Sequence, residues 1–231
     1  TVVVAFTPTV AMAYSGNLNL SATPGGGALP AVALSGTGLT AGALSINPTS
    51  KAYASTVINT ASAAQSFTVT NTGGSTTPVI TVSITGSAPS HANTLGAGLT
   101  CTISVTFNPT SIGAKSASLT ASLGATSATA SLSGTGLTQA VLSMSSPTQD
   151  FGNIPLGSTS APIVVTVTNS GQVVSGTPVV SKSGTDATQF TITNNNCTTG
   201  VAAGSTCTFQ VTLTPTGAVG SRAVTLTTTA S

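Results

Sequence analysis

Charge is what this sequence of 231 residues has least of. Asp, Glu, Lys and Arg make up only 3% of it, and glutamate is absent, whereas charged residues make up roughly 25% of an average protein. Surface charge usually keeps cytosolic domains soluble, so this composition favours a secreted or surface-displayed protein. The net charge of +2 comes from scattered residues rather than from a basic patch, which argues against nucleic acid as a partner.

The side chains of common active sites are equally scarce. The only histidine is His91, and the only carboxylates are Asp150 and Asp186. A nucleophile needs a base, and acid–base catalysis needs a suitable pair. Calcium takes 6–8 oxygens, and a zinc site built on Cys101 and His91 would have two ligands where four are usual. We therefore expect no enzyme, no metal and no cofactor. Aromatic residues are 3% with no tryptophan, too few for a stacking platform.

Long apolar runs and helical patterns are also missing. No run approaches the roughly 20 residues of a membrane-spanning helix, and no signal peptide precedes the first strand pattern. Apolar stripes at helical spacing and capping boxes are absent. Hydrophobic residues nevertheless make up 39% of the chain and alternate with polar ones, so the chain can bury a core and is not disordered. The sequence predicts an all-β protein.

One strand pattern occurs three times. Its copies are Cys207–Pro215, Cys101–Pro109 and Thr1–Pro8, the last lacking its first residue. Apolar residues occupy every second position of each copy, and a proline ends it. This period of two predicts a β-strand with one face in a core.

A second repeat gives the length of the structural unit. Ser-Gly-Thr-Gly-Leu-Thr occurs at Ser35–Thr40 and at Ser133–Thr138, 98 residues apart. We interpret each copy as a glycine turn between the last strand of one module and the first strand of the next. A repeat of this length matches one immunoglobulin-like β-sandwich. The sequence therefore predicts tandem modules: the C-terminal part of one at 1–39, a complete one at 40–137, and one lacking its last strand at 138–231.

Strands are predicted in each module from the same alternation. A segment from Pro48 to about Ala63 is expected to be irregular, and His91 is expected in a loop. The turns Thr-Asn-Thr-Gly-Gly and Thr-Asn-Ser-Gly follow corresponding strands of the two larger modules. The predicted strands lie near 2–6, 16–22, 31–34, 44–46, 66–69, 79–84, 101–107, 116–122, 126–132, 141–144, 163–167, 190–192, 207–213 and 222–228.

The best-defined motifs resemble those of a known family. Asp150–Ser158 (Asp-Phe-Gly-Asn-Ile-Pro-Leu-Gly-Ser), Val165–Gly171 and the Cys197–Val211 region resemble the ASH-type (abnormal-spindle and hydin) immunoglobulin-like repeats of bacterial choice-of-anchor D surface proteins. The resemblance implies a seven- or eight-stranded sandwich with an extracellular, non-enzymatic role, but no ligand. Tyr53-Ala-Ser stands where Phe-Gly-Asn is expected in the middle module.

The resemblance also implies a disulfide between Cys197 and Cys207, with two free thiols as the alternative. Cys101 matches Cys207, and His91 stands where Cys197 would be. Cys101 is thus unpaired. We expect it to be a buried small apolar residue, with intermolecular pairing as the alternative.

The repeat pattern predicts that the chain begins within one module and ends one strand short of completing another. Open edges expose backbone groups that can pair. A segment of a longer tandem array explains both ends, and we favour it over a subunit completed by a donated strand. The residues that would form such assembly edges are Val2, Val4, Phe6, Val224 and Leu226.

We therefore expect an extracellular or cell-surface protein, bacterial by the resemblance, that forms or decorates a fibre, sheath or stalk by self-association. The alternative is an adhesin or scaffold whose ligand-binding domain lies outside this segment. Glycan on Ser or Thr would help to solubilise it. Asn19 and Asn196 begin formal N-glycosylation sequons, near the number expected by chance in a Thr-rich chain, and Asn19 is expected to lie in a strand.

Overall fold

The computed structural model describes residues 1–21, 30–85, 91–146 and 148–230, with 91–93 described by their backbone only. It confirms the predicted all-β class, since the one helical element among these residues is the short 3-10 turn η1 (Ala187–Gln189). The strands are β1 (Ala13–Leu18), β2 (Val32–Thr37), β3 (Leu44–Asn47), β4 (Ser50–Ala52), β5 (Thr56–Val57), β6 (Gln65–Asn71), β7 (Ile80–Ile84), β8 (His91–Asn93), β9 (Thr100–Val105), β10 (Gly113–Leu123), β11 (Thr126–Leu137), β12 (Leu142–Met144), β13 (Ile163–Asn169), β14 (Val179–Ser183), β15 (Phe190–Thr193), β16 (Thr206–Leu213) and β17 (Thr225–Thr229).

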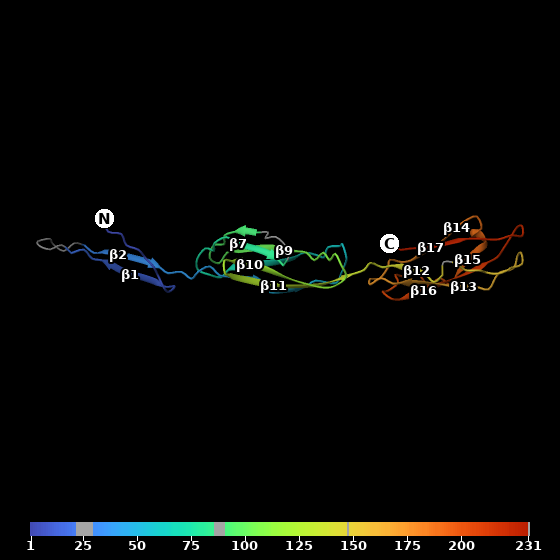
Figure 1. The fold of residues 1–231 in the computed structure, drawn as a ribbon, viewed down its shortest axis with the longest axis horizontal. Helices are drawn as coiled ribbons and strands as arrows, with labels where there is room; N and C mark the ends of the chain where they lie inside the picture. Colours follow the sequence, from blue (N-terminus) through green and yellow to red (C-terminus); the bar gives the residue numbers. More distant parts are fainter. Residues whose placement is uncertain (22–29, 86–90, 147, 231) are drawn as a thin grey trace. The chain divides into compact units, whose positions relative to one another are not determined.

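The middle sandwich consists of two sheets (Figure 1). One has the order β3-β6-β9, and the other has the order β4-β11-β10-β7-β8 with β5 also paired to β11. Phe67 and Val69 on β6 alternate with polar residues and are fully buried. They pack with Leu119 of the second sheet in one hydrophobic cluster. The predicted alternation therefore places its apolar face between two sheets, where burial of each large side chain contributes about 2 kcal/mol.

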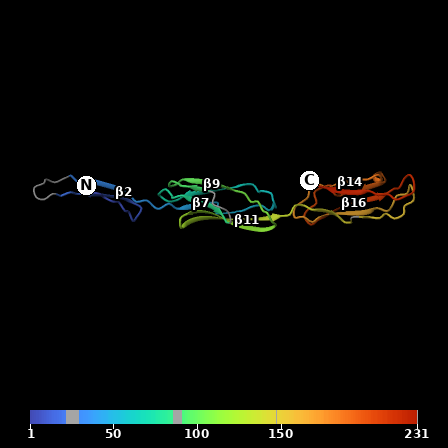
Figure 2. The same ribbon diagram turned by 45° about the horizontal axis from the view of Figure 1, so that its top comes forward.

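The C-terminal sandwich repeats this plan with fewer strands. Its larger sheet has the order β12-β13-β16-β15, and β14 pairs with β17 in a second sheet. Figure 2 shows β14 and β16 in separate layers. Phe209 and Val211 of β16 belong to its core, and two partly buried residues pack against them: Leu226 of β17 and Val224, which directly precedes β17. Among the described residues this core has seven buried hydrophobic members against 14 in the middle sandwich, so the sandwich with fewer strands has the smaller core.

The N-terminal part is a two-stranded hairpin, β1 paired with β2. The strand predicted near residues 2–6 is wrong: residues 1–8 form no strand and are exposed. An extended segment becomes a strand only through backbone hydrogen bonds to a neighbouring strand, and the structure provides none for it within the described residues. The strand predicted near residues 16–22 is found earlier, at Ala13–Leu18, so Asn19 follows a strand and does not lie in one.

The predicted glycine turn in the 98-residue repeat is also wrong. β11 continues through Ser133–Leu137 and pairs there in parallel with β5. Neither Gly134 nor Gly136 has a positive φ. A Cβ on Gly134 would lie 2.7 Å from Cε1 of Phe107, and one on Gly136 would lie 3.0 Å from Cβ of Pro109. These glycines are therefore required for close packing rather than for a turn.

The hairpin shows the same packing at the equivalent glycines. A Cβ on Gly36 would lie 3.0 Å from Cε1 of Phe6, and one on Gly38 would lie 2.9 Å from Cβ of Pro8. An aromatic residue and a proline therefore approach a Gly-Thr-Gly strand segment in both places. That residues 1–39 are the C-terminal part of a module stays a prediction.

The sequence patterns did not predict four short strands. The irregular segment after Pro48 contains β4 and β5, which both run parallel to β11. The loop expected around His91 contains β8, which pairs with β7. No strand was expected at β14. All four elements have five residues or fewer, too short for a period of two to stand out in the sequence.

Compactness divides the chain into two units, and each unit contains one sandwich core. The first unit is Thr1–Ala54 with Ser62–Phe107 and Lys115–Gly134, and the second is Ser55–Ala61 with Asn108–Ala114 and Thr135–Ser231.

Within the described residues, the structure contains no helix that could span a membrane.

Candidate functional site

A disulfide closes the loop before β16. Cys197 and Cys207 form the bond implied by the family resemblance, with their Cα atoms 5.1 Å apart. Cys197 is 1% exposed and belongs to the core. By limiting the entropy of the unfolded chain, a loop of this length stabilises the fold by about 3 kcal/mol. Disulfides persist in oxidising compartments, so this bond supports an extracellular location.

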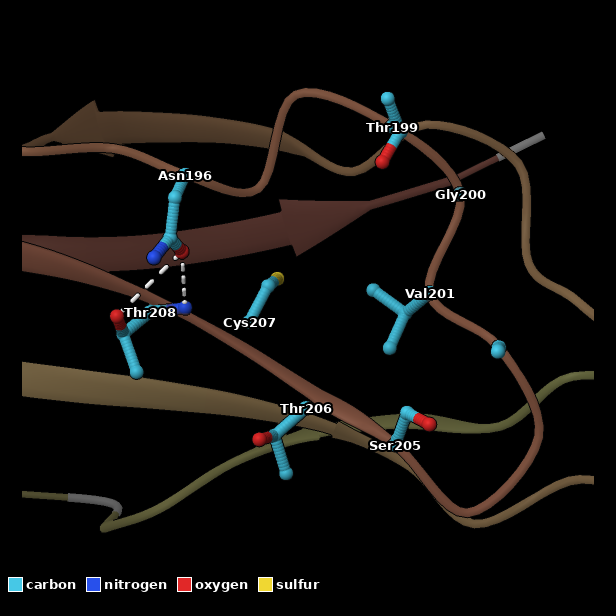
Figure 3. Close-up of a pocket in the computed structure, with 9 residues that line it drawn as sticks. Asn196, Thr199, Gly200, Val201, Ser205, Thr206, Cys207 and Thr208 are labelled. Carbon is cyan, nitrogen blue, oxygen red and sulfur yellow. Dashed lines mark hydrogen bonds between the residues drawn. The ribbon is translucent and has the colours of Figure 1, made fainter.

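A polar pocket of about 440 Å³ lies beside this loop. Figure 3 shows Asn196 and Thr208 facing each other across its edge. The Thr208 backbone N–H donates to Oδ1 of Asn196 at 2.7 Å, and the Asn196 N–H donates to the Thr208 carbonyl at 3.0 Å. The exposed residue Asn196 is thereby held against β16. The lining residues are neutral, so the pocket can hydrogen-bond a polar group but contains no acid, base or charged metal ligand.

A buried asparagine joins separate segments of the C-terminal sandwich, including the one that leads into its first strand, β12. Asn169 is completely buried. Its Nδ2 donates to the carbonyls of Val173 and Val201, at 2.8 and 2.9 Å. Its Oδ1 accepts from the N–H groups of Val141 and Gly171, at 3.1 and 2.9 Å. One side chain therefore satisfies two backbone donors and two backbone acceptors from three separate segments, as a buried polar group requires.

Asn71 makes the same four bonds in the middle sandwich. It is also fully buried, donates to the carbonyls of Ser75 and Leu95, and accepts from the N–H groups of Ala43 and Gly73. Sequence reasoning assigned both asparagines to turns and missed this role. The available signal was the recurrence of Thr-Asn-x-Gly at the same place in both modules.

Cys101 is a free thiol on β9, opposite Val69 of β6. It is partly buried against the middle core, which agrees with the expectation of a small apolar residue in all but the degree of burial. Burial raises the pKa of the Cys101 thiol above its ordinary value of 9.0. A thiol with a raised pKa is a poor nucleophile at neutral pH. The side chain of His91 lies outside the described part of the structure.

The apolar residues predicted as an N-terminal assembly edge are exposed. Val2, Val4 and Phe6 have exposed fractions of 62%, 54% and 53%. Phe6 packs edge-on against Tyr14, with ring centroids 5.6 Å apart. These side chains thus add apolar surface to the hairpin, although the residues themselves form no strand.

Val224 and Leu226, predicted as the other assembly edge, line a groove of about 1210 Å³. Its lining includes residues 150–156 and residues 219–226, which run into the start of β17. We call this cleft the β17 groove. Four core residues, each at most 7% exposed, also line it: Val165, Phe190, Val211 and Leu213.

The charged residues near this groove are engaged locally. Arg222 Nε lies 3.8 Å from Oδ1 of Asp186 and donates to Oε1 of Gln189 at 2.9 Å. Asp150 Oδ1 accepts from the Gly152 N–H at 2.9 Å. These contacts fix loop ends and leave the groove without a concentration of charge of one sign.

No family model matches this chain, and no curated protein matches it. Several solved structures match this chain at low sequence identity. A Porphyromonas gingivalis W83 protein of unknown function is 15% identical over 74% of this chain and 83% of its own, with a TM-score of 0.32. A CARDB domain from Pyrococcus furiosus is 18% identical over 41% of this chain and 94% of its own, with a TM-score of 0.29.

The first eight immunoglobulin domains of Down Syndrome Cell Adhesion Molecule give a third match. They are 11% identical over 88% of this chain and 26% of their own length, with a TM-score of 0.30. TM-scores at this level assign no function. The sheets and cores described above define the class of protein: an all-β chain of immunoglobulin-like sandwiches.

Proposed function

We propose that this chain is an extracellular structural protein whose immunoglobulin-like modules form or decorate a fibre, sheath or stalk on a cell surface. The observation that carries the proposal is the Cys197–Cys207 disulfide in a chain with almost no charge. The bond favours an oxidising compartment. Neutral surfaces can pack against one another without electrostatic repulsion.

The internal construction of the modules supports a structural role. Asn71 and Asn169 lock the entering chain to the turn that follows β6 or β13 by the same hydrogen bonds. A rigidly held segment at the start of each module suits a repeat protein, in which every module must have the same geometry. The proposal includes self-association, a role without catalysis, and glycan on Ser or Thr as a means of keeping neutral faces soluble.

The finer family assignment belongs to the same proposal. The Asp150–Ser158 motif, the buried asparagine and the disulfide loop occur together in one sandwich. We propose that the modules are ASH-type repeats of a bacterial choice-of-anchor D surface protein. The resemblance in sequence motifs supports this assignment, and fold alone would not.

Surface localisation and assembly of the native material test the proposal. Antibody labelling of intact cells should detect the chain, and negative-stain microscopy of the detached material should show regular filaments or a sheath. An intracellular, fully reduced chain contradicts the proposal. A surface-labelled protein that stays monomeric and binds a glycan or host surface instead establishes the alternative, an adhesin or scaffold.

A further inference from the structure

A glycosylation sequon lies just after the edge strand β15 of the C-terminal sandwich. Asn196-Cys-Thr has the Asn-x-Thr form in which an asparagine can accept a glycan. Asn196 and Thr198 are exposed, whereas Cys197 is buried. The other sequon, which begins at Asn19, adjoins residues 22–29, outside the described part of the chain. Only the Asn196 sequon can therefore be judged from its surroundings.

The amide of Asn196 is held by its oxygen. Oδ1 accepts from the backbone N–H of Thr208 at 2.7 Å and lies 3.4 Å from Oγ1 of the same residue. Figure 3 shows both contacts as dashed lines. Because a backbone N–H can only donate, the amide atom that faces it is the oxygen. The nitrogen, Nδ2, has no hydrogen-bond partner among the described residues, so a sugar on Nδ2 breaks no native hydrogen bond.

The sequon also lies beside a sheet edge that is only partly protected. β15 is the last strand in the order β12-β13-β16-β15, and within the described residues no strand pairs with its other side. Sheet edges are usually blocked by charged residues or proline. Lys182 blocks one end, where its Nζ donates to the carbonyl of Phe190. Residues 191–196 contain neither a charged residue nor a proline, so the end of β15 nearest Asn196 has no such protection.

We propose that Asn196 carries an N-linked glycan that covers the free edge of β15. In the transfer step Nδ2 loses a proton and bonds to C1 of the first sugar, and the lipid diphosphate that carried the oligosaccharide leaves. A glycan is bulky and solubilising, so it keeps another strand away from this edge without any charge. The proposal rests on the extracellular role proposed above and adds an asparagine-linked site to the glycan on Ser or Thr.

The folded structure also indicates when the sugar is added. The Asn196 N–H donates to the Thr208 carbonyl at 3.0 Å, and Cys197 is 1% exposed and bonded to Cys207. A transferase that must reach both the Asn196 amide and the Thr198 hydroxyl needs this tripeptide as a free segment, which these contacts prevent. We therefore expect transfer to precede closure of the disulfide.

Peptide mapping of the native material tests the attachment site. Cleavage after Lys182 and Arg222 releases one peptide, 183–222, in which Asn196 begins the only sequon. This peptide should have excess mass in whole sugar residues. Peptide-N-glycosidase in heavy-oxygen water should then convert that one asparagine to labelled aspartate. An unmodified peptide overturns the proposal, and if the same material is found on the cell surface, the proposed function stands without this site.

Variants made in a secretory host test the sequon and the timing. Thr198→Val should abolish the glycan and Thr198→Ser should retain it, while the control Asn19→Gln should leave the glycan on Asn196 unchanged. The glycosylated fraction should rise in Cys207→Ser, a readout that does not require this variant to fold, since transfer comes first. A fraction that does not rise contradicts the order of events.

Hydrogen exchange in Asn196→Gln tests whether the glycan covers the edge. Exchange at β15 should slow severalfold as the concentration of this variant increases, because uncovered edges pair, and should stay constant in the glycosylated chain. Unchanged exchange at β13 would show that the variant folds. If β15 exchanges at the same rate at every concentration in the variant, the glycan has no covering role.

Discussion

Removing the side chain of Asn169 is the most direct test of how a buried asparagine stabilises its own sandwich. In Asn169→Ala, four backbone groups lose their partner at once. Two of the bonds, to the Val201 carbonyl and from the Gly171 N–H, are buried. Water cannot replace them without opening the core.

The magnitude follows from those two bonds. Leaving a buried donor or acceptor unsatisfied costs about 1–3 kcal/mol each. The other two bonds are only partly buried, so water can compensate most of their loss. We expect Asn169→Ala to lower the free energy of unfolding of the C-terminal sandwich by about 4 kcal/mol, a large part of the 5–15 kcal/mol typical of a whole domain.

Hydrogen exchange as a function of urea measures the effect within each sandwich, which suits a chain without tryptophan. Opening of β13 and β16 should become easier in Asn169→Ala, while β6 and β9 should be unaffected. Asn71→Ala should reverse this pattern. The exposed Asn153 provides a matched control, and its replacement by Ala should change neither sandwich. A loss below 1 kcal/mol in both buried-asparagine variants would refute the role assigned to these bonds.

Three further outcomes are expected. Gly134→Ala should lower stability by about 2 kcal/mol because its Cβ crowds the ring of Phe107, and a smaller loss in a Phe107→Leu background, measured by chemical denaturation, would confirm the contact. Reduction of the Cys197–Cys207 disulfide should lower stability by about 3 kcal/mol, and equal melting of oxidised and reduced chains contradicts this. Alkylation of Cys101 in the folded chain should level off at a higher pH than in an unfolded control, because burial raises its thiol pKa and only the thiolate reacts; identical pH profiles of the folded and unfolded chains would contradict this.

The period-two patterns were sufficient to predict the strands that form the cores. β6, β9, β13 and β16 all lie where the alternation of apolar and polar residues places them. Each has two or more core positions within a short run, so burial of one face decides the conformation locally. The disulfide came from the family resemblance, because cysteine spacing alone does not distinguish a bond from two free thiols.

The Gly-Thr-Gly segments show where sequence reasoning failed. Glycine is common both in turns and where another group approaches the backbone. Only the neighbours of Gly134 and Gly136, which are distant in the sequence, show that close approach is the reason. The failure at residues 2–6 has a related cause, since a strand pattern cannot ensure that a partner strand lies beside it.

The sequence by itself determined the all-β class, the repeat length and the faces of the core strands, because these depend on local alternation and recurrence. The tertiary structure decided the roles of Asn71 and Asn169, the reason for the paired glycines and the existence of the β17 groove. Each of these depends on groups brought together from separate segments, and burial makes their hydrogen bonds and contacts obligatory.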